Sequence, residues 1–320
     1  MHFLQVGSVG NRYQRMLFSS RVVYKAALST GSDLFHFHDS ELIPVGLALR
    51  ARGKRVIYDV HESLAKSILS KPYLPAGIRR PIAMGAQAAE FVMARAATAI
   101  IAATPAIARQ FPPGKTITIQ NFPILGELAA PTRRPYQDRP PVALFSGGIT
   151  RHRGVIEMVE AIGETSHNAR LSLVGSFGRA DTEAEARSIS GWERVDFHGW
   201  QPRSALPDLM GEARVGLVLF HPEPNHVEAM PNKLFEYMSA GLPVIASDFP
   251  LWRSIVDDAG CGLLVDPQDP RAIAEAIDWM LEHPEEAEEM GHRGRKAVES
   301  RYNWEAESKK LIALYQRLLA

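Results

Sequence analysis

The sequence predicts an α/β protein of two domains, each built on a parallel sheet with helices on both faces. Short apolar runs alternate with helical patterns along the chain, which is typical of parallel strands buried on both sides. Charge divides the chain near Leu125: residues 1–125 hold 15 Lys and Arg against 6 Asp and Glu, whereas the remainder holds 21 against 30. Five prolines between Pro123 and Pro141 mark the same region as a connector. A single eight-stranded barrel, the competing α/β arrangement, fits this break less well.

Apolar β-forming runs predict the strands, and apolar residues three and four apart predict the helices. In the first half the expected order is helix 13–28, strand 34–37, helix 42–52, strand 55–58, helix 78–97, strand 99–102 and strand 116–119, which gives a sheet of four or five strands. In the second half the expected strands are 142–146, 171–174, 195–197, 215–220, 243–246 and 262–265, with helices at 155–162, 181–190, 205–212, 233–239 and 271–281. Two helices close the chain, at 285–300 and 303–320.

These elements predict a first domain at 1–125, a linker at 126–141, a second domain at 142–302 and a final helix at 303–320. The final helix carries apolar side chains on roughly one face, namely Trp304, Leu311, Ile312, Tyr315 and Leu318. An apolar face on a terminal helix needs a docking surface elsewhere in the chain.

Composition excludes several classes of protein. With 46% hydrophobic and 22% charged residues among 320, the chain is neither disordered nor collagen-like. Its one cysteine, Cys261, cannot form a disulfide within the chain, and its first residues lack the pattern of a secretory signal, so we expect a cytoplasmic protein. The most apolar long stretch, 81–103, is interrupted by polar residues and does not predict a membrane span.

The loop after the strand at 142–146 carries the residues of a candidate anion site. Gly147, Gly148, Arg151 and Arg153 stand directly before a helix whose N-terminus favours anions. Ligands of open parallel sheets bind at such loops, beyond the carboxyl ends of the strands. The pattern suits a phosphate cradle, and taken alone it also suits an ordinary turn with solvated arginines.

A second loop, after the strand at 215–220, leads into a helix that begins near Pro231. Seven residues separate Glu228 in the loop from Glu236 in the helix, and Lys233 lies at the helix start. Lysine and free backbone amides at that position neutralise a diphosphate, while carboxylates accept hydrogen bonds from sugar hydroxyls. The alternative is that Glu236 and Lys233 are a solvated pair on the helix surface.

The stretch MPNKLFEYMSAGLPVIAS at 230–247 closely resembles the donor-binding signature of glycosyltransferase family 4, including the spacing of its two glutamates. Further resemblances follow in the family's order: DLFHFHD at 33–39, YDVHE at 58–62, NFP at 121–123, FSGG at 145–148, RG at 153–154 and YNW at 302–304. The resemblance implies the GT-B fold, in which two Rossmann-like doubly wound domains face each other across a cleft. It also implies that the C-terminal helix crosses back to the first domain, here in a shortened form.

Residue by residue, the resemblance implies roles for the site. Glu236 resembles the glutamate that holds the donor ribose, and Glu228 the one that contacts the donor sugar. His38 resembles the histidine that faces this sugar from the first domain, so His38 and Glu228 are the expected catalytic residues. The remaining implied positions are Gly147, Gly148, Arg153, Asn232 and Lys233 for donor binding, His61 and Glu62 for shaping the cleft, and His36 as a structural residue.

The implied activity is that of a retaining, metal-independent hexosyltransferase. It moves a sugar from a nucleotide-sugar donor, expected to be a UDP- or GDP-sugar, to a saccharide or lipid-linked saccharide in bacterial cell-surface polysaccharide or glycolipid assembly. The acceptor hydroxyl attacks on the face that the diphosphate leaves, and a diphosphate oxygen takes its proton. The sequence holds no Asp-x-Asp motif, and we expect no metal, no cofactor besides the donor, and no nucleic acid partner.

Two alternatives stay open. One is a catalytically weak sugar-nucleotide-binding protein, or a subunit that needs a partner to complete its first domain; the other is a GT-B sugar-nucleotide epimerase. Many relatives have Gly-Arg where this chain has Gly147-Gly148, which leaves Arg151 as the candidate replacement, and only 35 residues precede His36, fewer than in relatives. We therefore expect donor binding to survive better than transfer, and an unpaired sheet edge to favour homo-oligomers.

The basic first half also suggests contact with an anionic membrane surface, the inner face of the cell membrane. Lys71, Arg79 and Arg80 precede apolar residues at 91–93 in the helix expected at 78–97. Basic and apolar side chains together favour anionic lipid. A buried helix beside solvated charges is the alternative.

Overall fold

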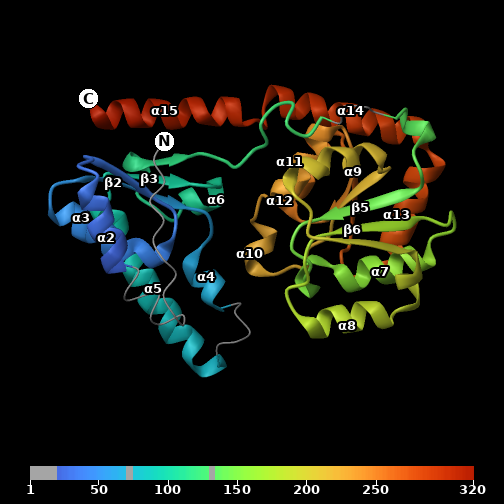
Figure 1. The fold of residues 1–320 in the computed structure, drawn as a ribbon, viewed down its shortest axis with the longest axis horizontal. Helices are drawn as coiled ribbons and strands as arrows, with labels where there is room; N and C mark the ends of the chain where they lie inside the picture. The colour runs from blue at the N-terminus through green and yellow to red at the C-terminus, as the bar shows by residue number, and fades with distance from the viewer. Residues whose placement is uncertain (1–19, 70–74, 130–133) are drawn as a thin grey trace. The chain divides into compact units, whose positions relative to one another are not determined.

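The protein, in a computed structural model, is described over residues 20–69, 75–129 and 134–320 (Figure 1). Its contacts separate two compact units. The first unit holds the chain up to Gln120 together with Glu307–Ala320, and the second unit holds Asn121–Ala306. The start of the helix expected at 13–28, Lys71, and positions 130–133 of the expected linker lie outside the described residues.

The first unit contains a parallel sheet whose described strands follow the order β1-β2-β3-β4. The strands are β1 (Leu34–Phe37), β2 (Arg55–Val60), β3 (Ala99–Ala102) and β4 (Thr116–Thr118), and the helices are α2 (Ser20–Ser29), α3 (Ile43–Ala51), α4 (Leu64–Leu69), α5 (Ala76–Ala96) and α6 (Pro105–Ala108). The expected alternation of strands and helices is confirmed. Met93, expected on an outer apolar surface with its two neighbours, is instead fully buried, because the helical repeat turns it toward the core while Phe91 and Val92 stay exposed.

The last helix, α15 (Trp304–Leu319), joins the first unit from Glu307 onward. The buried Glu307 carboxylate accepts a hydrogen bond from the Gln120 N–H at 3.1 Å, and Leu314 is buried. These contacts confirm the expected docking of the C-terminal helix on the first domain. The predicted apolar face needs one correction: Ile312 is exposed, because it lies about 100° around the helix from Leu311.

The second unit contains a six-stranded parallel sheet in the order β10-β9-β8-β5-β6-β7. The strands are β5 (Val142–Ser146), β6 (Arg170–Val174), β7 (Val195–Gly199), β8 (Val215–Val218), β9 (Val244–Ser247) and β10 (Gly262–Val265). Strand residues alternate between two cores: Ala143 and Phe145 enter one, whereas Leu144 enters the other. Each face of the sheet therefore carries its own apolar core, as in a doubly wound domain.

Helices cover both of these cores. They are α7 (Val155–Glu164), α8 (Ala180–Ser188), α9 (Leu206–Glu212), α10 (Pro224–Val227), α11 (Asn232–Ala240), α12 (Pro250–Ala259), α13 (Pro270–Glu282) and α14 (Pro284–Ser300). The sequence pattern did not predict α10 or α12. The former is a single turn, and the latter is recognisable mainly from Pro250 at its first turn and from the buried Trp252, Ile255 and Val256.

The described part of the expected linker packs onto the second unit. Tyr136 is buried, and its hydroxyl donates a hydrogen bond to the Arg214 carbonyl at 2.6 Å. Arg139, also buried, donates to the Ala213 carbonyl at 2.9 Å. The segment leading into β5 is therefore anchored rather than solvated, which constrains where β5 begins.

Candidate active site

The carboxyl ends of β5 and β8 lie side by side within the six-stranded sheet. β5 pairs with β6 on one side and with β8 on the other, so the direction of strand succession reverses between them. Doubly wound sheets bind ligands at such a reversal. The two predicted loops follow these two strands and therefore meet at one place.

Helix α11 is pinned against the end of β5. The Tyr237 hydroxyl accepts a hydrogen bond from the Ser146 N–H at 2.9 Å. Gly216 in β8 makes room for this ring, since a Cβ there would lie 2.4 Å from its edge. The first turn of α11 is thereby held beside the Gly147 loop, where a Cβ on Gly147 would lie 3.4 Å from Lys233 Nζ.

Lys233 is the unusual group of this site. Its side chain is only 7% exposed, and its ammonium lies 3.7 Å from the centroid of the Phe145 ring and 5.0 Å from that of Phe220. No described residue offers Nζ a hydrogen bond. Burial, reinforced by the nearby Arg153, holds the pKa of Lys233 well below its ordinary value. A buried cation with aromatic neighbours and no acceptor is poised to receive an anion.

The Arg153 side chain lies beside Lys233, against the two glycines of the loop after β5. Its Nη1 donates to the Gly148 carbonyl at 3.1 Å, and a Cβ on Gly148 would lie 2.9 Å from the same nitrogen. The guanidinium thus occupies the room that a larger residue at 148 would need. Gly147 has φ of +131°, a conformation open to glycine and strained for other residues. The structure therefore brings Gly147, Gly148, Arg153 and Lys233 together.

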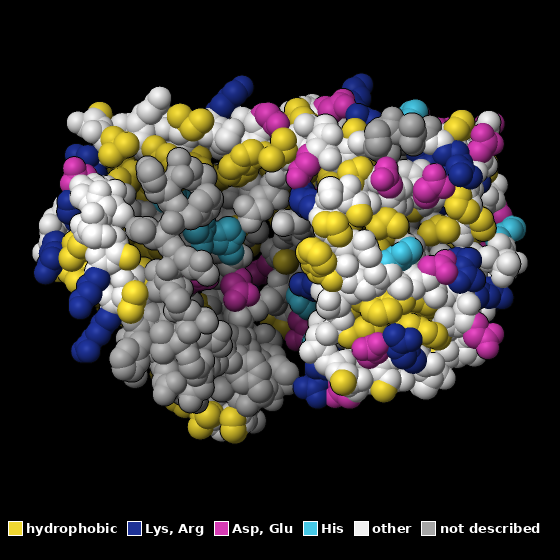
Figure 2. Space-filling view, in the orientation of Figure 1, with side chains coloured by type: hydrophobic (Ala, Val, Ile, Leu, Met, Phe, Trp, Pro, Cys, Tyr) yellow, Lys and Arg dark blue, Asp and Glu magenta, His cyan; other side chains and the backbone are white. Residues whose placement is uncertain are grey.

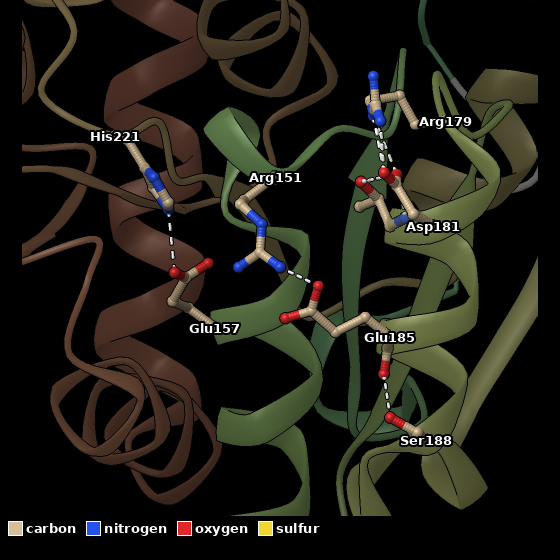
Figure 3. A network of polar contacts seen from close by, with 8 residues as sticks. Arg151, Glu157, Arg179, Asp181, Glu185, Ser188 and His221 are labelled. Carbon is tan, nitrogen blue, oxygen red and sulfur yellow. Dashed lines mark hydrogen bonds and ion pairs between the residues drawn. The ribbon is translucent and has the colours of Figure 1, made fainter.

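Arg151 does not join this group. Figure 3 shows its guanidinium pointing toward Glu185 of α8, with which it forms an ion pair. Glu157 of α7 points instead toward His221, whose Nε2 lies 3.0 Å from its carboxylate (Figure 3). As a replacement for the family's phosphate-binding arginine, Arg151 would first have to leave Glu185.

Glu236 faces a separate cavity of about 400 Å³ in the second unit, which Asn232 also lines. Arg203 donates to the Glu236 carboxylate at 2.7 Å and forms a two-pronged contact with Glu127 at 2.6 and 2.8 Å. The hydrogen bonds to these two carboxylates raise the pKa of the arginine. Glu236 is thus held in place by a charged partner and is not a solvated surface residue.

Glu228 directly follows the short helix α10 and is exposed. The end of the loop that carries Glu228 is anchored to α12, because the Trp252 indole donates a hydrogen bond to the Ala229 carbonyl at 2.8 Å. The buried Ser247 hydroxyl bridges the N–H and carbonyl of Phe220, at 2.8 and 2.9 Å, where the loop begins. Both ends of the loop are therefore anchored to β9 or to α12.

Histidines gather in the first unit at the ends of β1 and β2. The parallel register pairs Phe37 with Tyr58, so His36 and His38 share a face of the sheet with Asp59 and His61. Asp59 Oδ2 lies 3.1 Å from His36 Nε2 and 3.0 Å from His38 Nδ1, and Asp59 Oδ1 lies 3.4 Å from His61 Nε2. Tyr315 of α15 closes the group, with its hydroxyl 2.6 Å from His36 Nδ1.

Charge in this cluster centres on Asp59. Burial alone would raise the pKa of its carboxyl, but the contacts with His36 and His61 outweigh burial and lower it to about 2. Asp59 therefore stays ionised at neutral pH. The exposed Glu62 lies beside this group and lines a cavity of about 240 Å³ with His38 and His61.

Four residues of these sites were missing from the sequence-based prediction. Asp59 and Tyr315 complete the histidine cluster, and Arg203 and Glu127 hold Glu236. The Asp-x-His spacing of Asp59 and His61, beside the His-x-His spacing, was an available signal for the first of them. Nothing in the local sequence marks Arg203, because its partners lie 76 and 33 residues away.

Comparisons with known proteins place the chain among glycosyltransferases, as the sequence resemblance implied. A family model described as "Glycosyl transferases group 1" matches residues 131–297, just over half of the chain. D-rhamnosyltransferase WbpZ of Pseudomonas aeruginosa is 29% identical over 160 residues, 50% of this chain and 40% of its own. Alpha-maltose-1-phosphate synthase of Mycobacterium tuberculosis is 26% identical over 209 residues, 62% of this chain and 51% of its own. The chain thus spans about half the length of the curated relatives it matches.

Solved structures extend the likeness in fold to nearly the whole chain. Sucrose-phosphate synthase tll1590 from Thermosynechococcus elongatus superposes with a TM-score of 0.78 at 25% identity, covering 98% of this chain and 81% of its own. Anabaena Alr3699/HepE, solved in complex with UDP-glucose, superposes with a TM-score of 0.74 at 16% identity, covering 96% and 84%. The expected GT-B fold class is confirmed.

Proposed function

Because the chain belongs to the group 1 glycosyl transferases, we propose that it transfers a sugar from a nucleotide-sugar donor to a saccharide or lipid-linked saccharide, with retention of configuration. The observation that carries the proposal is the buried Lys233 ammonium, which no described residue accepts, beside Arg153 and two glycines at the strand ends. A diphosphate supplies the missing negative charge. The alternative interpretation, that Lys233 is a solvated residue on the helix surface, is inconsistent with its burial.

We assign the remaining donor contacts from the family resemblance, and the positions of the side chains support them. We assign Glu236, which Arg203 holds in a cavity that Asn232 also lines, to the donor ribose, from whose hydroxyls its carboxylate would accept hydrogen bonds. Glu228, on an anchored loop, is assigned to the donor sugar. His38 is assigned to the same sugar from the first unit, where Asp59 orients its ring. Arg203 and Glu127 are positioning residues for Glu236.

The chemical step needs stabilisation of the charge that develops on the leaving diphosphate. Lys233, Arg153 and backbone N–H groups of the glycine loop supply fixed positive charge at that point. The acceptor oxygen forms its bond to the anomeric carbon on the face from which the diphosphate oxygen departs, and that oxygen takes the acceptor's proton. Glu228 and His38 then contact the sugar while its ring carries positive charge.

The class of donor and acceptor is inferred from relatives. One solved neighbour was crystallised with UDP-glucose, and one curated relative is a rhamnosyltransferase. We propose a UDP- or GDP-sugar as donor and a bacterial cell-surface polysaccharide or glycolipid as product. The weak-binding and epimerase alternatives are separated by one experiment, in which turnover of a nucleotide sugar is measured with and without acceptor.

The two glutamates should respond differently to substitution. Glu236→Ala should weaken binding of the free nucleotide about 10- to 100-fold, the loss of one or two hydrogen bonds to a charged group. Glu228→Ala should leave free-nucleotide binding within about twofold and instead slow transfer from the sugar nucleotide, because its assigned partner is the sugar. Calorimetry with nucleoside diphosphates and a transfer assay measure the two effects.

Glu286→Ala, an exposed glutamate on α14, is the matched control and should change neither quantity. If both site variants bind nucleotide and transfer sugar like the parent, the assignment of the donor site is wrong.

We further propose that α5 contacts anionic lipid. Met84, Phe91 and Val92 are 70%, 58% and 51% exposed on this helix, close to Arg79, Arg80 and Arg95. Figure 2 shows hydrophobic side chains at the lower end of the first unit, where Figure 1 places α5, and Lys and Arg along its outer edge. Among the described helices, none has the length and apolarity that crossing a bilayer requires. Contact would therefore be made from the surface.

Binding to vesicles should require anionic lipid and fall as salt is added. Replacing Arg79 and Arg80 by Gln should weaken binding by about 10- to 100-fold, at about 1 kcal/mol for each basic residue near the surface. Ile312→Ser, at an exposed apolar position on α15, is the control and should bind like the parent. If the amount of protein that sediments with the vesicles depends on neither lipid charge nor salt concentration, the proposal is wrong.

A further inference from the structure

The histidine cluster of the first unit has the dimensions of a metal site. One ring nitrogen each of His36 and His38 and one Asp59 oxygen all lie within 4.8 Å of one another. The individual separations are 3.1 Å and 3.0 Å from Asp59 Oδ2, and His61 Nε2 lies 3.1 Å from His38 Nδ1. A tetrahedral zinc site with bonds of about 2.1 Å places its ligand atoms about 3.4 Å apart, so a small inward or outward adjustment of these rings suffices.

The carboxylate at the centre lacks a full set of donors. Asp59 Oδ1 is buried and accepts no well-formed hydrogen bond from any residue in the described part of the chain. The nearest ring nitrogen, His61 Nε2, stands 3.4 Å from it. Buried carboxylates are normally saturated by donors or by a cation. Asp59 Oδ1 lacks a hydrogen-bond donor, and ring nitrogens of His36, His38 and His61 surround the same carboxylate. Both observations indicate a binding site for a cation.

We propose that His36, His38 and Asp59 bind a zinc ion, with His61 as the fourth ligand. Imidazole nitrogens together with one carboxylate suit zinc better than Mg²⁺, which prefers six oxygens. Two of the four residues lie within strands: His36 is the last residue but one of β1, and Asp59 is the last residue but one of β2. The other two follow directly and are more exposed, so the ion enters from that side.

Tyr315 would not bind the ion itself but would hold the His36 ring in position. A ring that coordinates zinc through Nε2 carries its proton on Nδ1 and donates it to a neighbouring group. The Tyr315 hydroxyl, 2.6 Å from His36 Nδ1, is that acceptor. Zinc would thus bind to an arrangement that the C-terminal helix helps to hold.

The ion is not part of the transfer reaction. It would occupy the Nδ1 atom of His38, whose ring we assign to the donor sugar, and so zinc should inhibit transfer until a chelator removes it. This inhibition rests on the proposed function, whereas the binding of zinc does not. Measuring binding without any nucleotide or acceptor therefore keeps a failure of this inference distinct from a failure of the transferase assignment.

The test is a calorimetric titration of the full chain, first stripped with a chelator, with Zn²⁺. We expect one zinc per chain, no binding of Mg²⁺, and with Co²⁺ the intense visible absorption of a tetrahedral site. His38→Gln and His61→Gln change exposed rings and should fold normally, and each should weaken zinc binding by more than the about 10-fold expected for Tyr315→Phe. His167→Gln, at an exposed histidine of the second unit, should bind zinc like the parent.

Circular dichroism and melting of each variant show that the fold is kept. The inference is overturned if the parent binds no zinc, if Co²⁺ gives a six-coordinate spectrum, or if His167→Gln loses zinc as fully as His38→Gln.

Discussion

Replacing Lys233 by Met should abolish binding of nucleoside diphosphates and at the same time make the free protein more stable. Methionine preserves the length and apolar stem of the side chain but removes the ammonium. Without it, the diphosphate loses its buried cation, and we expect the affinity to fall by at least about 100-fold, the equivalent of one strong charge-assisted contact.

The gain in stability follows from the burial of the charge. An unpaired buried ammonium costs several kcal/mol relative to water, and its contact with the Phe145 ring returns about 2 kcal/mol. The first effect is larger, so Lys233→Met should melt at a higher temperature than the parent when no ligand is present. A stabilising substitution that destroys binding identifies a residue kept for function.

A second readout concerns protons. Burial lowers the pKa of Lys233 in the free protein, and a bound diphosphate would raise it again. Binding should therefore take up protons, and affinity should fall as pH rises above the lowered pKa of the free protein. Calorimetry in two buffers of different ionisation enthalpy measures this uptake, which should vanish in Lys233→Met.

Lys296→Met, at an exposed lysine on α14, is the control and should alter neither binding nor melting. Unchanged nucleotide affinity in Lys233→Met would contradict the diphosphate site, whatever its melting temperature.

Replacing His38 by Ala should reduce the rate of transfer by about 100- to 10,000-fold, the range observed when a positioned catalytic side chain is lost. Affinity for the free nucleotide should stay within about twofold, because every assigned nucleotide contact lies in the second unit. The His38 side chain is 57% exposed, so its truncation should cost little stability.

Steady-state transfer in the presence of EDTA checks this prediction, since the chelator removes any inhibitory zinc from the comparison. His292→Ala, at an exposed histidine on α14, serves as the control. Full activity of His38→Ala would show that the histidine cluster has no part in the reaction.

The local pattern of residues was enough to predict most strands and helices. Each core strand is a short apolar run buried on both faces, as Val142–Ser146 and Val215–Val218 show, and such a run can be recognised without knowledge of the neighbouring strands. Short helices were not predicted, because a single turn such as Pro224–Val227 is too short to show the helical repeat of apolar residues.

The sequence by itself determined the alternation of elements, the two charged halves, and the residue types at the two donor loops. Only the tertiary structure decided which groups meet. The order of β5 beside β8 brings Lys233 onto Gly147, and the register of β1 on β2 gathers three histidines around Asp59. Arg203 reaches Glu127 across 76 residues, and Tyr315 reaches His36 across 279. Such contacts depend on chain topology and burial, which local periodicity does not encode, because a side chain's partner is set by which elements pack together.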